Sequence, residues 1–248
     1  MSPPAFTPEQ RDQVRERLLE MARADARVTA GALVGSSAGG GDRWSDLDIT
    51  FGLAEGTAPP EILAEWTLAL EREFGAVHLF DLPFRASLYR VFLFPGALQV
   101  DVSFTPGAEF RPLGPNWKLL FGEAKEPAEI PPTPANHQFG LAVHHAVRAR
   151  ICIERGNWLE AEFWISGVRD QALALACLRR ALPSAHARGA DQLPDDLRAA
   201  FAGALVKEME KAELLRALSA AVELLIAEAG ESQALASKTG AALRALRS

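Results

Sequence analysis

The chain has 248 residues, a length that predicts two domains because single domains commonly run about 50 to 250 residues. Hydrophobic residues make up 48% and charged residues 23%, which are ordinary globular values and exclude global disorder. The 26 lysines and arginines against 32 aspartates and glutamates give a net charge of -6, which excludes an overall positive field able to hold long nucleic acid nonspecifically.

A helix is the first predicted element, and it begins after Thr7. Pro8 suits the first helical position, and Gln10 in the first turn is typical of a capped helix start. We expect this helix to end near Asp25, so that residues 1–27 form a lead-in helix.

Five short apolar runs follow, and we predict a β-strand for each of them. They cover residues 31–35, 47–53, 76–80, 87–94 and 97–104. A helix is expected at residues 60–74, where apolar side chains recur at helical spacing. Pro95 and Gly96 predict a tight hairpin, which makes the last two strands antiparallel and the sheet mixed. Residues 28–110 are therefore expected to form one domain.

Proline and glycine are frequent after this region, and we expect residues 111–135 to connect two domains. Beyond the connection the pattern is helical, which predicts a helical bundle at residues 136–248. The expected helices cover residues 136–155, 157–182 and 194–229 with a break near Gly203, and a last helix starts at Glu231. One core-facing stripe is formed by Ala161, Ile165, Val168, Ala172 and Leu175. The predicted fold class is α+β, a mixed-sheet domain followed by an all-α bundle.

Cysteine content and the amino terminus indicate the compartment. Only Cys152 and Cys177 are present, so a disulfide framework or a cysteine-rich zinc site cannot be built. The amino terminus carries charge where a signal peptide needs an apolar core, and no uncharged run approaches the ~20 residues that span a bilayer. We expect a cytoplasmic protein that has no contact with membranes.

The segment with the clearest chemistry runs from the first strand into the second. A strand ends at Gly35, a loop of small residues follows, and Asp46 and Asp48 stand two apart at the start of the next strand. Alternation in a strand puts both aspartates on one face, where their charges repel unless a cation lies between them. Hard divalent cations prefer such oxygen ligands, so the pattern predicts a magnesium site.

A third acid is expected to complete this site. Asp101 points away from the apolar face of its strand, and an aspartate in an otherwise buried strand needs a partner. Asp81, at the end of another strand, competes with Asp101 for this role. Three acids beside a glycine-rich turn suit nucleotidyl transfer, because backbone amides of the turn can hold phosphates while two metal ions activate the attacking hydroxyl and steady the leaving pyrophosphate.

These residues resemble the signature of the nucleotidyltransferases of the DNA polymerase β superfamily, which is Gly-Ser, a spacer, Asp-x-Asp in a strand, and a further acid on a later strand. The matching residues are Gly35, Ser36, Asp46, Asp48 and Asp101, with residues 37–45 as the spacer. The size and the helical second half are similar to the small antibiotic nucleotidyltransferases that modify aminoglycosides or lincosamides.

The resemblance implies a role for each matching residue. Gly35 and Ser36, with Ser37 beside them, would bind the triphosphate, and Asp46 and Asp48 would be magnesium ligands. Asp101 would be the third carboxylate, so that two Mg²⁺ ions and ATP as co-substrate lie in the cleft between the domains. Near this site, Trp44 either stacks on the nucleotide base or covers the core beside its loop.

The second half offers candidates for a general base. Glu162, Ser166 and Arg169 form a polar stripe on one predicted helix. Asp170, Glu162 or Glu160 would accept the proton of the acceptor hydroxyl, and Arg169 would steady phosphate charge. The alternative is that these residues form solvated or interhelical ion pairs.

Two further motifs have a structural interpretation. His144 and His145 point about 100° apart on a helix, which indicates packing or cleft residues and not ligands of one metal. Arg180 and His186 superficially resemble the Arg-His motif of helical HEPN ribonucleases, but Pro183 interrupts the helix that this motif needs.

The sequence therefore predicts an enzyme that transfers a nucleoside monophosphate, AMP from ATP, to a hydroxyl of a small molecule such as an antibiotic, with release of pyrophosphate. The alternatives are transfer to a protein or RNA acceptor, and a noncatalytic module that senses nucleotide or neutralises a toxin. We expect a monomer or a homodimer.

Overall fold

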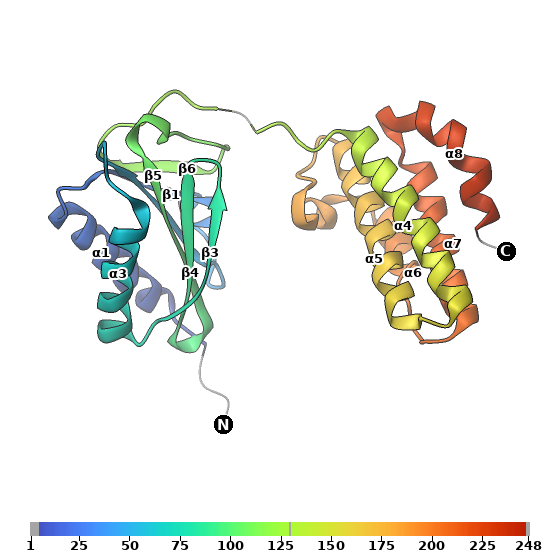
Figure 1. Cartoon of the computed structure of the whole chain (residues 1–248), viewed down its shortest axis with the longest axis horizontal. Helices are drawn as coiled ribbons and strands as arrows, with labels where there is room; N and C mark the ends of the chain where they lie inside the picture. The colour runs from blue at the N-terminus through green and yellow to red at the C-terminus, as the bar shows by residue number, and fades with distance from the viewer. Residues whose placement is uncertain (1–4, 129, 247–248) are drawn as a thin grey trace. The chain divides into compact units, whose positions relative to one another are not determined.

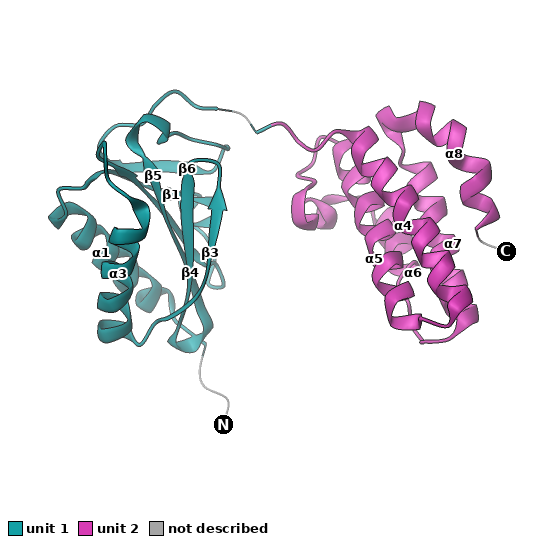
Figure 2. Cartoon of the chain, in the orientation of Figure 1, with its two compact units in different colours: residues 1–130 teal, residues 131–248 magenta. Residues whose placement is uncertain are grey.

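The computed structural model describes residues 5–128 and 130–246 and divides the chain into two units, Met1–Ile130 and Pro131–Ser248 (Figure 2). The first unit begins with α1 (Pro8–Ala24), as predicted. Its start is a capping box, because the Gln10 N–H donates to Thr7 Oγ1 at 3.3 Å while the Thr7 N–H donates to Gln10 Oε1 at 2.8 Å.

A six-stranded mixed sheet forms the centre of the first unit (Figure 1). Its strands are β1 (Val28–Val34), β2 (Leu47–Leu53), β3 (Val77–Phe84), β4 (Ser87–Phe94), β5 (Leu98–Pro106) and β6 (Trp117–Phe121). The order is β3-β4-β5-β2-β1-β6, and among the described residues only β2 and β5 pair in parallel. Strands lie at all five predicted places and the sheet is mixed, as predicted, but the third strand continues to Phe84, so Asp81 lies inside β3 and not at the end of a strand. The predicted hairpin at residues 95–97 is confirmed too, with Gly96 in the left-handed region at φ 75°.

The prediction that residues 111–135 are only a connection is wrong. β6 lies within this stretch and pairs antiparallel with the outer edge of β1, and the first unit extends to Ile130. β6 is a short, mostly apolar run of five residues between proline- and glycine-rich segments, so it carries a strand signal that the prediction missed, and pairing with β1 adds it to the sheet.

α1 and α3 (Pro59–Phe74) cover one face of the sheet (Figure 1), and α3 confirms the helix predicted there. Apolar side chains from alternate strand positions pack under both helices. Trp66 of α3 contacts Phe51 of β2 and Phe104 of β5, with ring centroids 5.2 Å and 5.0 Å apart. Because side chains alternate along a strand, the opposite face of β2 and β5 carries the polar residues, among them Asp48 and Asp101.

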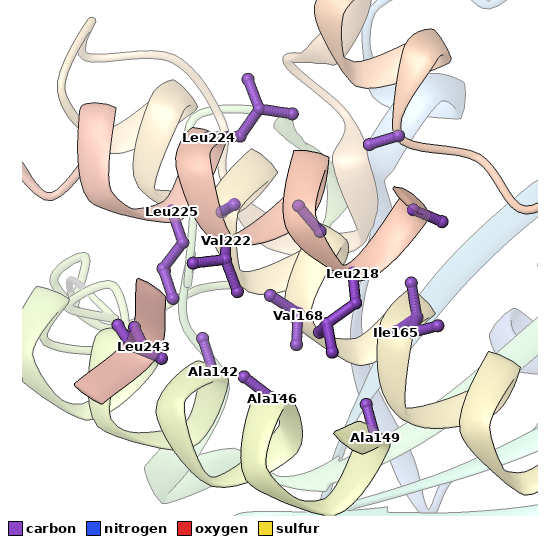
Figure 3. Close-up of a cluster of buried hydrophobic side chains, with 14 of the residues drawn as sticks. Ala142, Ala146, Ala149, Ile165, Val168, Leu218, Val222, Leu224, Leu225 and Leu243 are labelled. Atoms are coloured by element: carbon purple, nitrogen blue, oxygen red, sulfur yellow. The ribbon is translucent and has the colours of Figure 1, made fainter. Parts of the chain in front are cut away.

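The second unit is a bundle of helices, as predicted. Its helices are α4 (Ala135–Arg155), α5 (Trp158–Leu178), α6 (Asp195–Gly203), α7 (Lys211–Ala227) and α8 (Gln233–Ala245). Figure 3 shows its core, where Ala142, Ala146 and Ala149 of α4 face larger side chains of α5 and α7 such as Val168 and Leu218. These alanines let the helices pack closely. The predicted stripe of α5 is confirmed, because all five of its residues are buried.

One predicted boundary in this unit is wrong and one predicted break is longer than expected. The second helix ends at Leu178 and not at residue 182, because Ala181 adopts a left-handed conformation at φ 55° and the Leu182 N–H bonds back to the Cys177 carbonyl at 2.9 Å. The break near Gly203 is confirmed but extends over residues 204–210. None of the described helices is long and apolar enough to cross a bilayer.

Candidate active site

The glycine-rich turn after β1 begins with a single helical turn, α2 (Gly35–Ala38), where the sequence predicts an irregular loop. Gly35 opens this turn at φ +59°, a conformation that side chains other than glycine rarely adopt. A Cβ atom at this position would lie 2.5 Å from Asp48 Oδ2. Glycine is therefore required twice, for the backbone angle and for the close approach of the Asp48 carboxylate.

Hydrogen bonds tie this turn to the start of β2. The Ser36 hydroxyl donates to Asp46 Oδ1 at 3.1 Å, and the Ser37 hydroxyl donates to the Asp46 carbonyl at 2.9 Å. Ser37 Oγ also accepts from the Asp48 N–H at 3.3 Å. The Ser37 hydroxyl, predicted to bind phosphate, thus makes hydrogen bonds within the loop. These bonds, with that of Ser36, fix the positions of Asp46 and Asp48 relative to the turn.

Asp48 and Asp101 occupy paired positions on the two parallel strands β2 and β5. Side chains at paired positions emerge from the same face, so the two carboxylates lie side by side on the face opposite α1 and α3. Asp46 lies in the loop directly before β2, and whether its side chain shares the face of Asp48 stays a prediction. It is still close enough for its charge to act on Asp101.

The surroundings of Asp101 disfavour its charged form. Burial raises the pKa of the Asp101 carboxyl; the Gln99 amide, which donates to Asp101 Oδ1 at 3.0 Å, lowers this pKa in part, and the Asp46 charge raises it further. The pKa of Tyr89 is also raised, mainly by burial, with Ser103 opposing the shift and the charges of Asp48 and Asp101 adding to it. Burial and the neighbouring carboxylates thus both act against negative charge at Asp101 and Tyr89.

Asp81, the competing third acid, lies elsewhere. It forms a two-point ion pair with Arg90, with Nε–Oδ1 and Nη2–Oδ2 distances of 2.7 Å and 2.6 Å. Arg90 pairs with Val102, whose side chain is in the core under the helices, and it also donates to Thr67 of α3. Asp81 is thus on the helical face of the sheet, whereas Asp101 faces the other way.

The donor set can be tested against Mg²⁺. Among residues 5–128 and 130–246, no group of three or more His, Cys, Asp or Glu side chains is arranged as a protein-only metal site. Mg²⁺ usually takes one or two carboxylates and completes its shell with waters and substrate phosphates. The adjacent Asp48 and Asp101 fit that mode, because a cation beside them would offset the burial and the Asp46 charge, which both raise the pKa of Asp101.

Trp44 does not cover the core. Its side chain is 69% exposed, and the Arg43 guanidinium lies 4.3 Å from its ring centroid. Of the two interpretations of this residue, packing against the core is excluded, and stacking on a nucleotide base stays a prediction.

The three acids of the helical unit that were predicted as candidates for the general base contact different partners. Glu162 accepts from the Ser166 hydroxyl at 2.6 Å, and Ser166 in turn accepts from Arg169 at 3.0 Å, so this polar stripe is linked within itself. Glu160 contacts Arg148 and the Trp164 indole N–H. Asp170 is 65% exposed and has Arg169 at 3.8 Å. Which acid acts as the base stays a prediction.

The remaining motifs have structural roles. His144 and His145 pack against Trp164, with ring centroids 5.9 Å and 5.2 Å away. Arg180 donates to the buried Glu228 at 2.7 Å, and His186 lies in a separate loop. The arginine of the HEPN-like motif therefore forms a structural ion pair.

The sequence analysis missed an apolar band beside the carboxylates. Phe80 pairs with Val91, which pairs with Asp101, and Leu82 pairs through Tyr89 with Ser103 in the same way. Phe80, Leu82 and Phe84, here called the β3 band, are 53%, 53% and 41% exposed. The alternation that puts Phe80, Leu82 and Phe84 on one face of this strand was a signal, but only the strand order places that face near Asp101.

No family model matches the chain, and no curated protein matches it. Among solved structures, the chain is similar to an aminoglycoside 6-adenyltransferase from Bacillus subtilis. The sequences are 12% identical, the match covers 94% of this chain and 96% of that chain, and the TM-score is 0.41. What the chain does is therefore inferred from its own residues.

Proposed function

We propose that the chain is a magnesium-dependent nucleotidyltransferase that moves a nucleoside monophosphate, AMP from ATP, to a hydroxyl of a small molecule and releases pyrophosphate. The observation that carries the proposal is the pairing of Asp48 with Asp101 beside a turn whose first residue must be glycine. A purely structural role does not explain two adjacent carboxylates on neighbouring strands, because their repulsion costs stability.

The turn and the carboxylates have different proposed roles. Backbone N–H groups around Gly35 and the Ser36 hydroxyl would hold phosphate oxygens, while Asp48 and Asp101, with Asp46 nearby, would hold Mg²⁺. When bound, two Mg²⁺ ions would supply charge neutralisation of the triphosphate and activation of the attacking hydroxyl. The hydrogen bond from Ser36 to Asp46 links the two parts, so phosphate binding and metal binding depend on the same loop geometry.

The β3 band supports a small, partly apolar acceptor. Two strand spacings of about 4.8 Å separate the Phe80 backbone from that of Asp101, or about 10 Å in all. Exposed aromatic side chains at this distance suit an organic molecule whose hydroxyl reaches the carboxylates. A long nucleic acid would instead need a basic surface, which the net charge of -6 does not favour.

The test is incubation of the chain with labelled ATP, Mg²⁺ and a panel of hydroxylated small molecules, with pyrophosphate release as the readout. We expect acceptor-dependent release that Asp48→Asn and Asp101→Asn abolish. Release with RNA or protein but with no small molecule would favour the alternative acceptors. Nucleotide binding without release under any condition would favour the sensor or antitoxin-like alternative.

A further inference from the structure

The first unit contains a small cavity on the helical side of the glycine-rich turn. Its volume is about 250 Å³, below the range of about 300–1,000 Å³ that is usual for drug-sized ligands, so it suits a small ion. The cavity is lined from α1, β1, β2, β6 and the turn after β1, which all belong to the same unit.

The cavity and the candidate active site lie on opposite faces of the sheet. Leu33 and Leu47, which line the cavity, belong to the core under α1 and α3. Asp48 and Asp101 emerge from the other face, because side chains alternate along a strand. Neither of these acids, nor Ser36, is among the described lining residues of the cavity.

Positive charge dominates the lining of this cavity. Arg11, Arg15 and Lys118 stand against a single acid, Asp12, among the described lining residues, although the net charge of the whole chain is -6. Arg15 already has two acidic partners, Asp12 at 2.9 Å and Glu16 at 3.0 Å. The surplus of positive charge therefore comes from Arg11 and Lys118.

Arg11 and Lys118 both have donors left for a ligand. Nη1 of Arg11 donates to the Asp42 and Ser45 carbonyls at 2.7 Å and 2.9 Å, and its Nε and Nη2 have no hydrogen bond to any described residue. Lys118 pairs with Leu33 across β6 and β1, so its side chain emerges on the helical side of the sheet. Neither cation forms an ion pair within the part of the chain that the structure describes.

The glycine-rich turn adds backbone donors. Gly39 has φ -89° and ψ 6°, and Gly40 follows at φ +94°, so a right-handed residue precedes a left-handed one. Successive N–H groups in this arrangement form a concavity that binds anions. The N–H groups of Gly40 and Gly41, which both line the cavity, have no hydrogen-bond partner among residues 5–128 and 130–246.

We propose that this cavity binds a small phosphate anion, orthophosphate or pyrophosphate, through Arg11, Lys118 and the N–H groups of Gly40 and Gly41. Cations with unused donors and a concavity of backbone N–H groups supply the charge and the hydrogen bonds that a phosphate group needs. The inference goes beyond the proposed nucleotidyl transfer and does not depend on it, because the cavity lies on the other face of the sheet.

The test titrates the full chain with orthophosphate and with pyrophosphate, in EDTA and at constant ionic strength, and follows binding by phosphorus NMR. We expect saturable binding of at least one of them. Tighter binding of pyrophosphate identifies a diphosphate site, and equal or tighter binding of orthophosphate identifies a site for a single phosphate group.

Lys118→Gln should weaken the binding about five- to tenfold, because it removes a charge-assisted hydrogen bond. Lys125→Gln is the matched control, since it makes the same charge change at an exposed lysine of the same unit that is not among the lining residues of the cavity. It should bind phosphate as the wild type does.

Asp12→Asn should change the affinity in the opposite direction. It removes the one acid of the lining and frees Arg15 from one of its two partners, so we expect phosphate to bind about two- to fivefold more tightly. A gain in affinity cannot come from a variant that fails to fold.

Ser36→Ala and Asp48→Asn, which alter the proposed transfer site, should bind phosphate as the wild type does. The titration contains neither ATP nor Mg²⁺, so failure of the proposed function leaves this result intact. The inference is overturned if neither anion binds saturably, if Lys118→Gln binds as well as the wild type, if Asp12→Asn does not bind more tightly, or if Ser36→Ala loses the binding.

Discussion

Replacing Gly35 with alanine tests how the turn positions the Asp48 carboxylate, the proposed magnesium ligand. The new methyl group would lie 2.5 Å from Asp48 Oδ2, whereas ordinary contact begins at 3.4 Å, so the carboxylate must move by about 0.9 Å. The φ of +59° adds about 1–2 kcal/mol of backbone strain. Because a displacement of about 1 Å at a catalytic group can cost about 100-fold in rate, we expect a loss of that size in pyrophosphate release.

Gly56→Ala is the matched control. Gly56 has φ +79°, lies in the loop after β2, and has no atom within 4 Å of an added Cβ. Both variants should lose similar stability in urea unfolding, but Gly56→Ala should keep its activity once it is measured on folded protein. If Gly35→Ala transfers nucleotide within a few-fold of the wild type, the Asp48 carboxylate does not depend on the turn and the reasoning is refuted.

Three further predictions concern acids and their partners. Asp101→Asn should abolish transfer yet raise Tm at neutral pH, because burial raises the pKa of Asp101 and its charged form opposes folding; a lower Tm would argue against this. Asp81→Asn should keep full activity and lose about 1 kcal/mol of stability, because it breaks the ion pair with Arg90. That pair lowers the pKa of Asp81 in the folded state. The ion pair therefore adds its full stability above the unfolded-chain pKa of about 3.9, and this stability is lost as the pH falls through the lower pKa of the folded state. The urea unfolding curves of the wild type and of Asp81→Asn should converge in acid. Glu228→Ala should cost about 1–3 kcal/mol in the same assay, because it leaves Arg180 without its buried partner, and an unchanged midpoint would contradict the structural role of this pair.

Elements with strong local signals could be predicted from the sequence. Thr7 and Gln10 set the start of α1, and Pro95 with Gly96 set the β4–β5 hairpin. By contrast, β6 was missed because its apolar run of five residues lies among prolines and glycines, and only its pairing with β1 shows that it belongs to the sheet. The end of α5 was missed because nothing in its sequence marks Ala181 as left-handed.

The candidate site, too, could be predicted only in part from the sequence. The residue types and spacing from Gly35 to Asp48 could be interpreted from the sequence, but the choice between Asp81 and Asp101 required the strand order. Asp101 is the acid that pairs with Asp48 across the β2–β5 junction, and Asp81 turns to Arg90 on the helical face. Strand order and register depend on contacts between distant segments, which spacing along the chain does not encode.

The central claim is that Asp48 and Asp101 jointly hold magnesium-bound nucleotide. Isothermal calorimetry with a nonhydrolysable ATP analogue tests this directly, with and without Mg²⁺, on the wild type and on Asp48→Asn. The account predicts heat of binding only for the wild type with Mg²⁺ present. Equal binding without the cation, or unchanged binding by Asp48→Asn, would contradict it.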